Sequence, residues 1–292
     1  MLANYICPNG NVCPIEQCLA ECIINKEMKT GRCLSYRMLK EMASQRAWQE
    51  IPTVTQLLSG TREEFLKLTR DYSASPQSLV AAYFGSRIHE KLQHGTEDER
   101  MICEQRLLDP TGTYSGQFDC YDKQNMILYD TKTYGSFKAA SVLGIKKIKE
   151  PVIDPFTGEV ELTPRGKIKQ RTRFVETVRH MRDVTLQLNA YRIMLENQGY
   201  PVKQMFVELI VRDAGTWIAK DRGIEQNAML VKVNKVSDNH VQKFFLAKAR
   251  RLLDSLHSNK MPPPCRPIET WGGLKCKAFC NVRGFCERGR SK

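Results

Sequence analysis

The sequence has 292 residues, of which 41% are hydrophobic and 26% charged, as is ordinary for a globular protein with a packed core. It contains no run of 18 or more apolar residues and no basic-then-apolar start, so we expect a cytoplasmic protein without membrane span or secretory signal. A net charge of +13 favours a polyanionic partner such as nucleic acid.

Residues 1–50 form a cysteine-rich N-terminal extension. Its cysteines are Cys7, Cys13, Cys18, Cys22 and Cys33. Helices are expected around 14–24 and over 33–48. A further helix is expected over 61–70, where Thr61 is a capping-type residue and Glu64 follows three positions later.

A helix from 76 to about 93 precedes a change in pattern. The next three segments predict the strands of an antiparallel meander: 103–108, 114–121 and 126–133. Turn-forming residues separate these strands at 109–112 and 122–125. The basic segment that follows, 146–173, contains a turn at 154–158 and predicts a hairpin-like insertion.

The remaining segments predict helices alternating with strands. They are a helix over 174–198, strands over 203–212 and 228–234, and a helix over 237–257. A cysteine-rich C-terminal segment, 258–292, follows. We therefore expect an α/β core over 51–257, with a central mixed sheet flanked by helices and cysteine-rich extensions at both ends.

Asp119, Asp130 and Lys132 form the most informative group of charged residues. Asp130 and Lys132 are two apart in a predicted strand, so they project from one face. Asp119 ends the preceding strand, and pairing through the turn at 122–125 would place it beside Asp130. A cation relieves the repulsion of adjacent carboxylates, and oxygen ligands suit Mg²⁺ or Mn²⁺. An exposed meander with an ordinary salt bridge is the alternative, which spacing alone does not exclude.

These residues also carry a resemblance to a known family. Gly116, three residues before Asp119, followed by Asp130 and Lys132 at a strand end, resembles the PD-(D/E)XK nuclease superfamily. The resemblance is to its RecB-like exonuclease branch in particular. It implies a restriction-endonuclease-like fold and hydrolysis of phosphodiesters.

Two further motifs of that branch stand in family order within residues 76–215. The segment from Gly85 to His89 is similar to its glycine-to-histidine motif on the helix before the sheet. Gln187 and Tyr191, four apart, are similar to its Gln-x-x-x-Tyr motif on the helix after the sheet. Each motif alone is weak, because residues four apart merely share a helix face.

The resemblance implies a role for each matching residue. The metal ligands would be His89, Asp119, Asp130 and the main-chain carbonyl of Thr131. Lys132 would be the catalytic lysine, while Gln187 and Tyr191 would shape the site or contact the DNA backbone. Asp130 stands where the family more often has Glu, and both supply oxygen ligands.

The C-terminal cysteines indicate a second metal centre. They are Cys265, Cys276, Cys280 and Cys286, and such spacing in a reducing compartment indicates Zn²⁺ or an iron–sulfur cluster. Iron–sulfur members of the branch include AddB-type helicase–nucleases and nucleases that accompany CRISPR loci. These hold a 4Fe–4S cluster with one cysteine from before the core and three from the end of the chain.

The resemblance therefore implies four cluster ligands: Cys33, Cys276, Cys280 and Cys286. The first tail gap is three residues where two is usual, and 34–102 contains no cysteine, so Cys265 stays open as the fourth ligand. The other N-terminal cysteines could hold a separate Zn²⁺ or donate to the tail cluster. Cys103 and Cys120 are expected to be small buried hydrophobic residues.

Basic runs at 146–149 and 165–173 could neutralise phosphates, and Tyr134, Phe137 and Phe174 could stack on bases. We expect a metal-dependent DNA nuclease, acting as an exonuclease on single strands or DNA ends. A protein partner in a DNA-processing complex fits the same pattern. The alternatives are a non-catalytic zinc-stapled nucleic-acid-binding module and a structural subunit of a helicase–nuclease complex.

Overall fold

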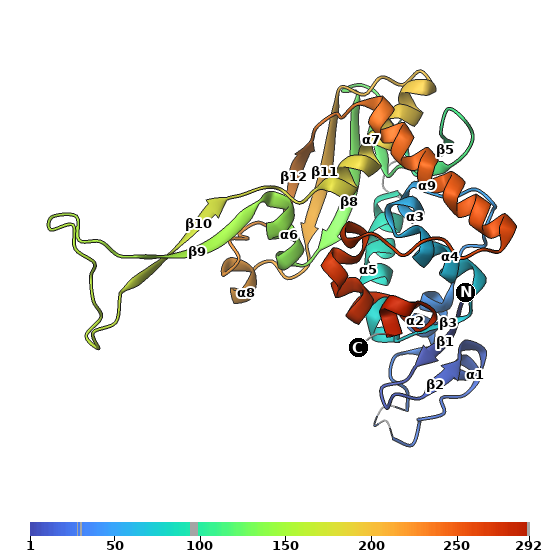
Figure 1. Ribbon diagram of the computed structural model, residues 1–292, viewed down its shortest axis with the longest axis horizontal. Coiled ribbons are helices and arrows are strands. Elements are labelled where there is room, and N and C mark those ends of the chain that lie inside the picture. Colours follow the sequence, from blue (N-terminus) through green and yellow to red (C-terminus); the bar gives the residue numbers. More distant parts are fainter. Residues whose placement is uncertain (28, 30, 94–98, 291–292) are drawn as a thin grey trace.

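A five-stranded mixed sheet lies at the centre of the protein (Figure 1), in a computed structural model that describes residues 1–290 apart from 28, 30 and 94–98. Its strands in spatial order are β12 (Ala228–Val233), β11 (Gln204–Val211), β8 (Ile127–Tyr134), β7 (Cys120–Asp122) and β4 (Met101–Cys103). β8 and β11 are parallel, and the other neighbouring strands are antiparallel. The predicted α/β class with a central mixed sheet is confirmed.

Helices flank this sheet on both sides. α7 (Arg182–Asn197) packs against β8 and β12, and both α9 (Asp238–Ser258) and α3 (Val54–Leu58) pack against α7. α5 (Pro76–Gln93) and α6 (Ser136–Leu143) contact β8, and α8 (Trp217–Lys220) contacts α6. Among the described residues, no helix has the length and apolar composition needed to cross a membrane.

α6 has no counterpart among the elements predicted from the sequence. Its N-terminus is held by a residue far along the chain rather than by a local cap. The carboxylate of Asp213 accepts hydrogen bonds of 2.6 Å from both the backbone N–H and the hydroxyl of Ser136. A local sequence pattern does not reveal such a contact, because it forms only in the folded chain.

The predicted meander is interrupted in its first two strands. The expected strand 103–108 is divided between β4 and β5 (Arg106–Leu108), and 114–121 between β6 (Ser115–Gln117) and β7. β5 and β6 pair as a separate two-stranded sheet. The break falls at Glu104, whose φ of 54° lies in the left-handed region that a strand does not use. Both interruptions lie next to residues of the functional site.

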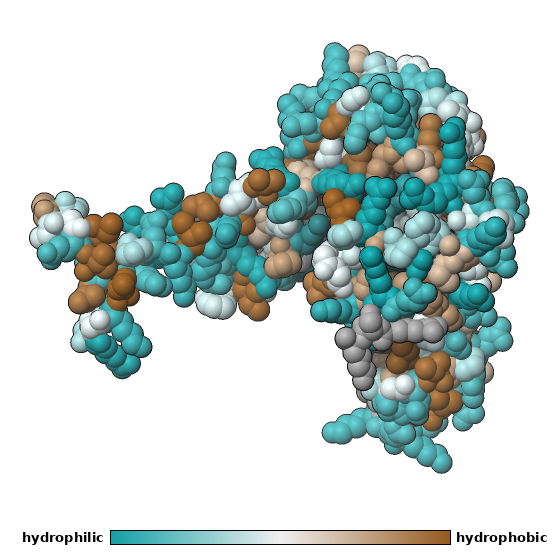
Figure 2. Space-filling view, viewed as in Figure 1, coloured by the Kyte–Doolittle hydropathy of each residue, from teal (hydrophilic) through white to brown (hydrophobic). Residues whose placement is uncertain are grey.

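A two-stranded arm projects from the core (Figure 1). It is formed by β9 (Ile145–Pro151) and β10 (Gln170–Glu176), which confirms the predicted hairpin. The helix predicted from residue 174 is wrong at its start, because Phe174 pairs with Lys147 in the arm and α7 begins only at Arg182. Figure 2 shows hydrophobic residues toward the far end of the arm, where Phe156 is 95% exposed.

The N-terminal region has a small sheet that the sequence pattern does not predict. Its strands lie in the order β2 (Val12–Pro14), β1 (Leu2–Ile6) and β3 (Tyr72–Ala74). The expected helices there are present but shorter, as α1 (Ile15–Ala20) and α2 (Tyr36–Ala43). Because β3 belongs to this sheet, a boundary at residue 50 would cut through it.

The C-terminal segment returns from α9 to the core as short helical turns. They are η1 (Pro267–Gly273), η2 (Lys275–Phe279), η3 (Arg283–Phe285) and α10 (Glu287–Arg290). This segment contacts α4 (Thr61–Thr69), where Arg62 Nε donates to the carbonyl of Pro262 at 2.7 Å. The predicted capping by Thr61 is wrong: Gly60 is the N-cap residue of α4, and Thr61 is the first residue within the helix.

Candidate functional site

β8 brings Asp130 and Lys132 together at the centre of the sheet. The two side chains share a face, as the strand period predicts, and Lys132 Nζ lies 2.7 Å from Asp130 Oδ2. Asp130 is fully buried. Among the described residues, neither of its carboxylate oxygens has a hydrogen-bond partner of acceptable geometry. A buried carboxylate left in this state is costly unless a further positive group lies against it.

Asp119 lies beside this pair, at the interruption between β6 and β7. Its Oδ2 accepts a hydrogen bond of 2.6 Å from the backbone N–H of Thr131. Burial and the charge of Asp130 raise the pKa of Asp119 to about 8, although Lys132 and the Thr131 N–H act in the opposite direction. The predicted proximity of Asp119 and Asp130 is therefore present in the structure.

His89 reaches the same place from α5. Its Nδ1 lies 3.3 Å from Asp119 Oδ2 and 3.8 Å from Glu104 Oε1. His89, Glu104 and Asp119 each offer one ligand atom, and these three atoms all lie within 4.8 Å of one another. We call these three residues the metal group.

Glu104 is a member of this group that the sequence reasoning missed. Its backbone N–H donates to the carbonyl of Asp119 at 2.9 Å, and its Oε2 accepts from Gln117 Nε2 at 2.6 Å. The pairing of Cys103 with Cys120 places the next residue along, Glu104, beside Asp119. The predicted ligands Asp130 and Thr131 lie outside the three-residue group but contact Lys132 and Asp119, respectively.

These residues fit a hard divalent cation. The donors are carboxylate oxygens and one imidazole, a set that suits Mg²⁺ or Mn²⁺. Asp130 supplies a further observation, because both of its oxygens are buried and, in the described part of the chain, Lys132 Nζ contacts only Oδ2, without the geometry of a hydrogen bond. A cation near Asp119 and Asp130 would also remove the repulsion between the two carboxylates.

Gln187 and Tyr191, both on α7, line the same pocket as the metal group and Lys132. Gln187 Nε2 donates to the hydroxyl of Tyr191 at 2.9 Å, and both side chains are buried. Burial and the nearby Asp130 raise the pKa of Tyr191 to about 12, although the bond from Gln187 lowers it. Gly116 permits this packing, because a Cβ there would lie 2.6 Å from Tyr191 Cε1.

An open pocket of about 680 Å³ connects these residues to solvent. Its lining includes His89, Glu104, Asp119, Lys132, Gln187 and Tyr191. It also includes Arg46 and Arg106, two cations that the sequence reasoning missed. Burial and the charge of Arg46 lower the pKa of Arg106, so the two guanidinium groups lie close enough to interact.

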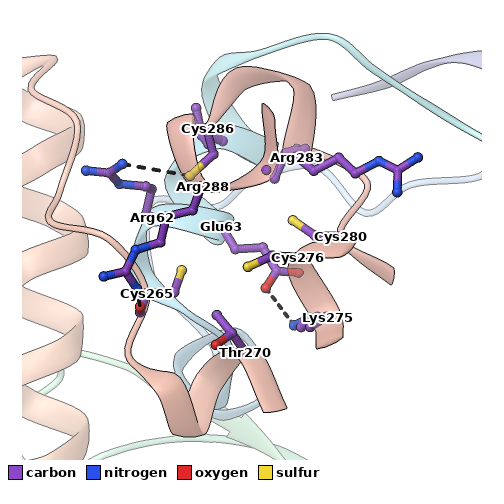
Figure 3. Close-up of a pocket in the computed structure, with 13 residues that line it drawn as sticks. Arg62, Glu63, Cys265, Thr270, Lys275, Cys276, Cys280, Arg283, Cys286 and Arg288 are labelled. Atoms are coloured by element: carbon purple, nitrogen blue, oxygen red, sulfur yellow. Dashed lines mark hydrogen bonds and ion pairs between the residues drawn. The ribbon is translucent and has the colours of Figure 1, made fainter. Parts of the chain in front are cut away.

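The tail cysteines form a second site, on the N-terminal end of α4 (Figure 3). The sulfur atoms of four cysteines face one another across a shared pocket: Cys265, Cys276, Cys280 and Cys286. We call these four cysteines the tail site. Arg62 and Glu63 from α4 line the same pocket, so the site joins the end of the chain to the core.

Hydrogen-bond donors point at the sulfur atoms of the tail site. Arg62 Nη1 lies 3.8 Å from Cys286 Sγ, and the backbone N–H of Glu63 donates to Cys265. Gly60 allows Cys265 its position, because a Cβ on that residue would lie 2.3 Å from the sulfur. Burial raises the pKa of the Cys280 thiol to about 11, with Glu63 adding to the shift.

The spacing of these sulfur atoms bears on which metal they would hold. A tetrahedral zinc site with zinc–sulfur bonds of about 2.3 Å places its thiolates about 3.8 Å apart. Among the described residues, the three atoms within 4.8 Å of one another are those of His89, Glu104 and Asp119, and no cysteine trio is that close.

Cys33 does not lie with the tail site. It packs with Cys7, Cys13, Cys18 and Cys22 in the core of the N-terminal region, around Tyr5, Ile24 and Leu39. We call these five cysteines the head group. Cys265, rather than Cys33, lies with the three other tail cysteines. Cys33 lies shortly before α2, and the contacts of α2 with α1 and α5 keep this part of the chain in the N-terminal region.

Cys103 and Cys120 also differ from expectation. They form a disulfide between the paired strands β4 and β7, and both are half-buried rather than buried. Both were expected to be small buried hydrophobic residues, because each has apolar neighbours in the sequence. The pairing follows from the register, which places the two directly opposite each other.

No family model matches the chain, and no curated protein matches it either. Among solved structures, the crystal structure of SSO0001 is similar, with a TM-score of 0.44 and 13% sequence identity. That match covers 87% of this chain and 93% of the other. Such a likeness says nothing about function.

Proposed function

We propose that the protein is a metal-dependent nuclease of the PD-(D/E)XK type, acting on DNA. The observation that carries this proposal is the convergence of His89, Glu104 and Asp119 on the buried Asp130–Lys132 pair. An ordinary structural salt bridge does not require a second carboxylate and a histidine beside it, at the edge of an open pocket. The order of the motifs along the chain supports the same superfamily.

The metal group and Asp130 would hold Mg²⁺ or Mn²⁺, which supplies polarisation of a phosphodiester and activation of water when bound. Lys132 has a raised pKa, since Asp130 and Asp119 outweigh the effect of burial, and it stays protonated at neutral pH. A protonated Lys132 stabilises negative charge that develops on the phosphate. Tyr191 stays neutral and, oriented by Gln187, donates or accepts a hydrogen bond at the pocket wall.

The net charge of +13 supports a nucleic acid as the substrate. The arm adds exposed basic side chains, among them Arg171 and Arg173. We propose single-stranded DNA or DNA ends as the preferred substrate, and a protein partner that works on the same DNA. Both statements rest on the resemblance and on charge.

The tail site would hold a 4Fe–4S cluster through its four cysteines. The resemblance favours this cluster, and the donors from Arg62 and Glu63 suit an anionic group. The cluster would fasten the C-terminal segment to α4. A brown preparation with about four iron ions per chain is expected, and a colourless one with stoichiometric zinc would contradict it.

The nuclease proposal is tested by degradation of an end-labelled single-stranded DNA with Mn²⁺. Asp130→Asn and Lys132→Gln should each lower the rate by about 10²–10³-fold or more, while chelation of the metal should abolish it. Asp254→Asn, at an exposed position of α9, is the matched control and should cut normally. Equal rates in all four proteins would overturn the proposal. An RNA of the same sequence, run in parallel, tests the choice of DNA.

A further inference from the structure

Arg46 and Arg106 stand between two hollows of the surface. Both line the active-site pocket, together with residues of the metal group, and both also line a second hollow of about 320 Å³. Trp48 and Ile51 contribute apolar surface to the second hollow. The two arginines are therefore shared by the wall of the active-site pocket and the wall of the neighbouring hollow.

The two guanidinium groups are held by neutral partners. Arg106 donates to Ser115 Oγ at 3.0 Å and to Gln117 Oε1 at 2.9 Å. Arg46 donates to the same Gln117 oxygen at 3.5 Å. Within the described part of the chain, neither arginine forms a salt bridge to a carboxylate at 4.0 Å or less.

This arrangement places two like charges side by side without an acidic partner. Gln117 fixes both of them through one oxygen atom, so the pair is oriented as well as charged. Two cations at this distance repel each other, and an anion between them would relieve that cost. Guanidinium groups match phosphate oxygens in geometry, which makes a phosphate the fitting anion.

We propose that Arg46 and Arg106 bind the phosphodiester adjacent to the one at the metal group, and that the second hollow receives the nucleoside beyond it. The inference rests on the proposed function, since it assigns that site a second subsite along the strand. The nucleoside would lie against Trp48 and Ile51, because aromatic and apolar surface accepts any base without reading its identity. The subsite thus favours a strand over a mononucleotide.

The test measures binding without cleavage. A fluorescent oligothymidylate of about 12 nucleotides is titrated with the full chain in Ca²⁺, and anisotropy is followed over a range of salt concentrations. Arg46→Gln and Arg106→Gln should each weaken binding by about 5- to 20-fold and lower the salt slope by about one. Arg250→Gln, at an exposed position of α9 that lines neither hollow, should stay within twofold of wild type.

Arg106→Lys guards against a structural explanation, because it keeps the charge and loses the planar fork. It should retain the salt slope while losing part of the affinity. The measurement is repeated with a 5′-phosphate, a 3′-phosphate or neither. An equal loss on all three substrates is expected for an internal phosphodiester, whereas a loss confined to one end would overturn the assignment in favour of a terminal phosphate.

The two proposals fail in different ways. If the arginine variants bind with wild-type affinity and slope while the wild type cuts DNA, the subsite is wrong and the nuclease stands. If binding depends on both arginines but Asp130→Asn changes no cleavage, the nuclease is wrong and the phosphate subsite stands.

Discussion

The head group and the tail site contain the same kind of residue in different surroundings. The five head cysteines are packed with Tyr5, Ile24 and Leu39 and make up much of the core of their small region. The four tail cysteines face a pocket with Arg62 and a helix N-terminus directed at their sulfur atoms. Burial raises thiol pKa values in both groups, to about 11 for Cys18 of the head and to about 11 for Cys280 of the tail. The tail site differs by the donors from Arg62 and Glu63, which stabilise a thiolate.

The difference shows why cysteine spacing alone does not assign a metal. In the head group, burial raises the pKa of Cys18 to about 11, and its cysteine neighbours add to the shift. The expectation of zinc at Cys7, Cys13, Cys18 and Cys22 stays a prediction, and no trio of described cysteine sulfurs has the close spacing that zinc requires. The residues around the cysteines, rather than the number of cysteines, distinguish the head group from the tail site.

The largest expected effect separates the two groups by their iron content. On the proposal of a 4Fe–4S cluster, Cys286→Ala removes one of its four ligands, so bound iron should fall from about four per chain to less than one, and stability should fall by several kcal/mol. Cys13→Ala, at a fully buried head position, should leave the iron content unchanged. Iron analysis and thermal unfolding measure both. Loss of iron in Cys13→Ala would show that the two groups share one cluster.

A smaller effect is expected from Gly60→Ala. The added Cβ would lie 2.3 Å from Cys265 Sγ, so the cysteine or α4 must shift, at a cost of about 1–3 kcal/mol. The iron content should fall as well, because a displaced Cys265 would bind the cluster less well. Gly284→Ala in the same segment is the matched control, because its Cβ would meet no atom within 4 Å. Equal iron in both variants would place Cys265 outside the ligand set.

The smallest effect concerns the charges that attach the tail to α4. Burial opposes ionisation of Glu63, but Lys67 and Lys275 outweigh it and hold the pKa of Glu63 below 4.5. Lys275 Nζ lies 2.6 Å from its carboxylate. A lowered folded-state pKa gives stability that is present above about pH 4.5 and lost as the pH falls through the folded value.

Glu63→Gln should therefore cost about 2 kcal/mol at pH 7 and flatten the dependence of stability on pH below about 5. Urea unfolding between pH 3 and 7 measures both quantities. Glu16→Gln, an exposed residue of α1 in the head, should reproduce the wild-type curve. If the stability of Glu63→Gln coincided with that of the wild type at every pH, its carboxylate would contribute nothing to the attachment of the tail.

Much of the core could be predicted from local periodicity. β8, β11 and α9 lie close to their expected bounds, since each carries a continuous apolar pattern of the right period. The same period places Asp130 and Lys132 on one face. Local apolar patterns therefore suffice to predict these elements and the shared face of the two residues.

The features that the sequence did not predict depend on contacts between residues far apart in the chain. Glu104 enters the metal group only because its backbone adopts a left-handed conformation and a neighbouring strand brings Asp119 to it. Whether Cys33 or Cys265 lies with the other tail cysteines depends on how α2 and α4 pack, and the spacing of cysteines in the sequence does not encode that packing. Arg46 falls within the helix expected over 33–48, but α2 ends at Ala43, so the sequence pattern does not mark Arg46 as part of the pocket.

The contact between Arg62 and Cys286 spans 224 positions of the chain. During synthesis the ribosome releases α4 long before it releases the residues that complete the site on that helix. The sheet and α9 emerge in between, so most of the core is available to fold while the N-terminus of α4 still lacks its partner. Any cofactor bound by the four tail cysteines would therefore join a chain whose sheet and α9 have already been synthesised, and its acquisition would follow the folding of the core rather than nucleate it.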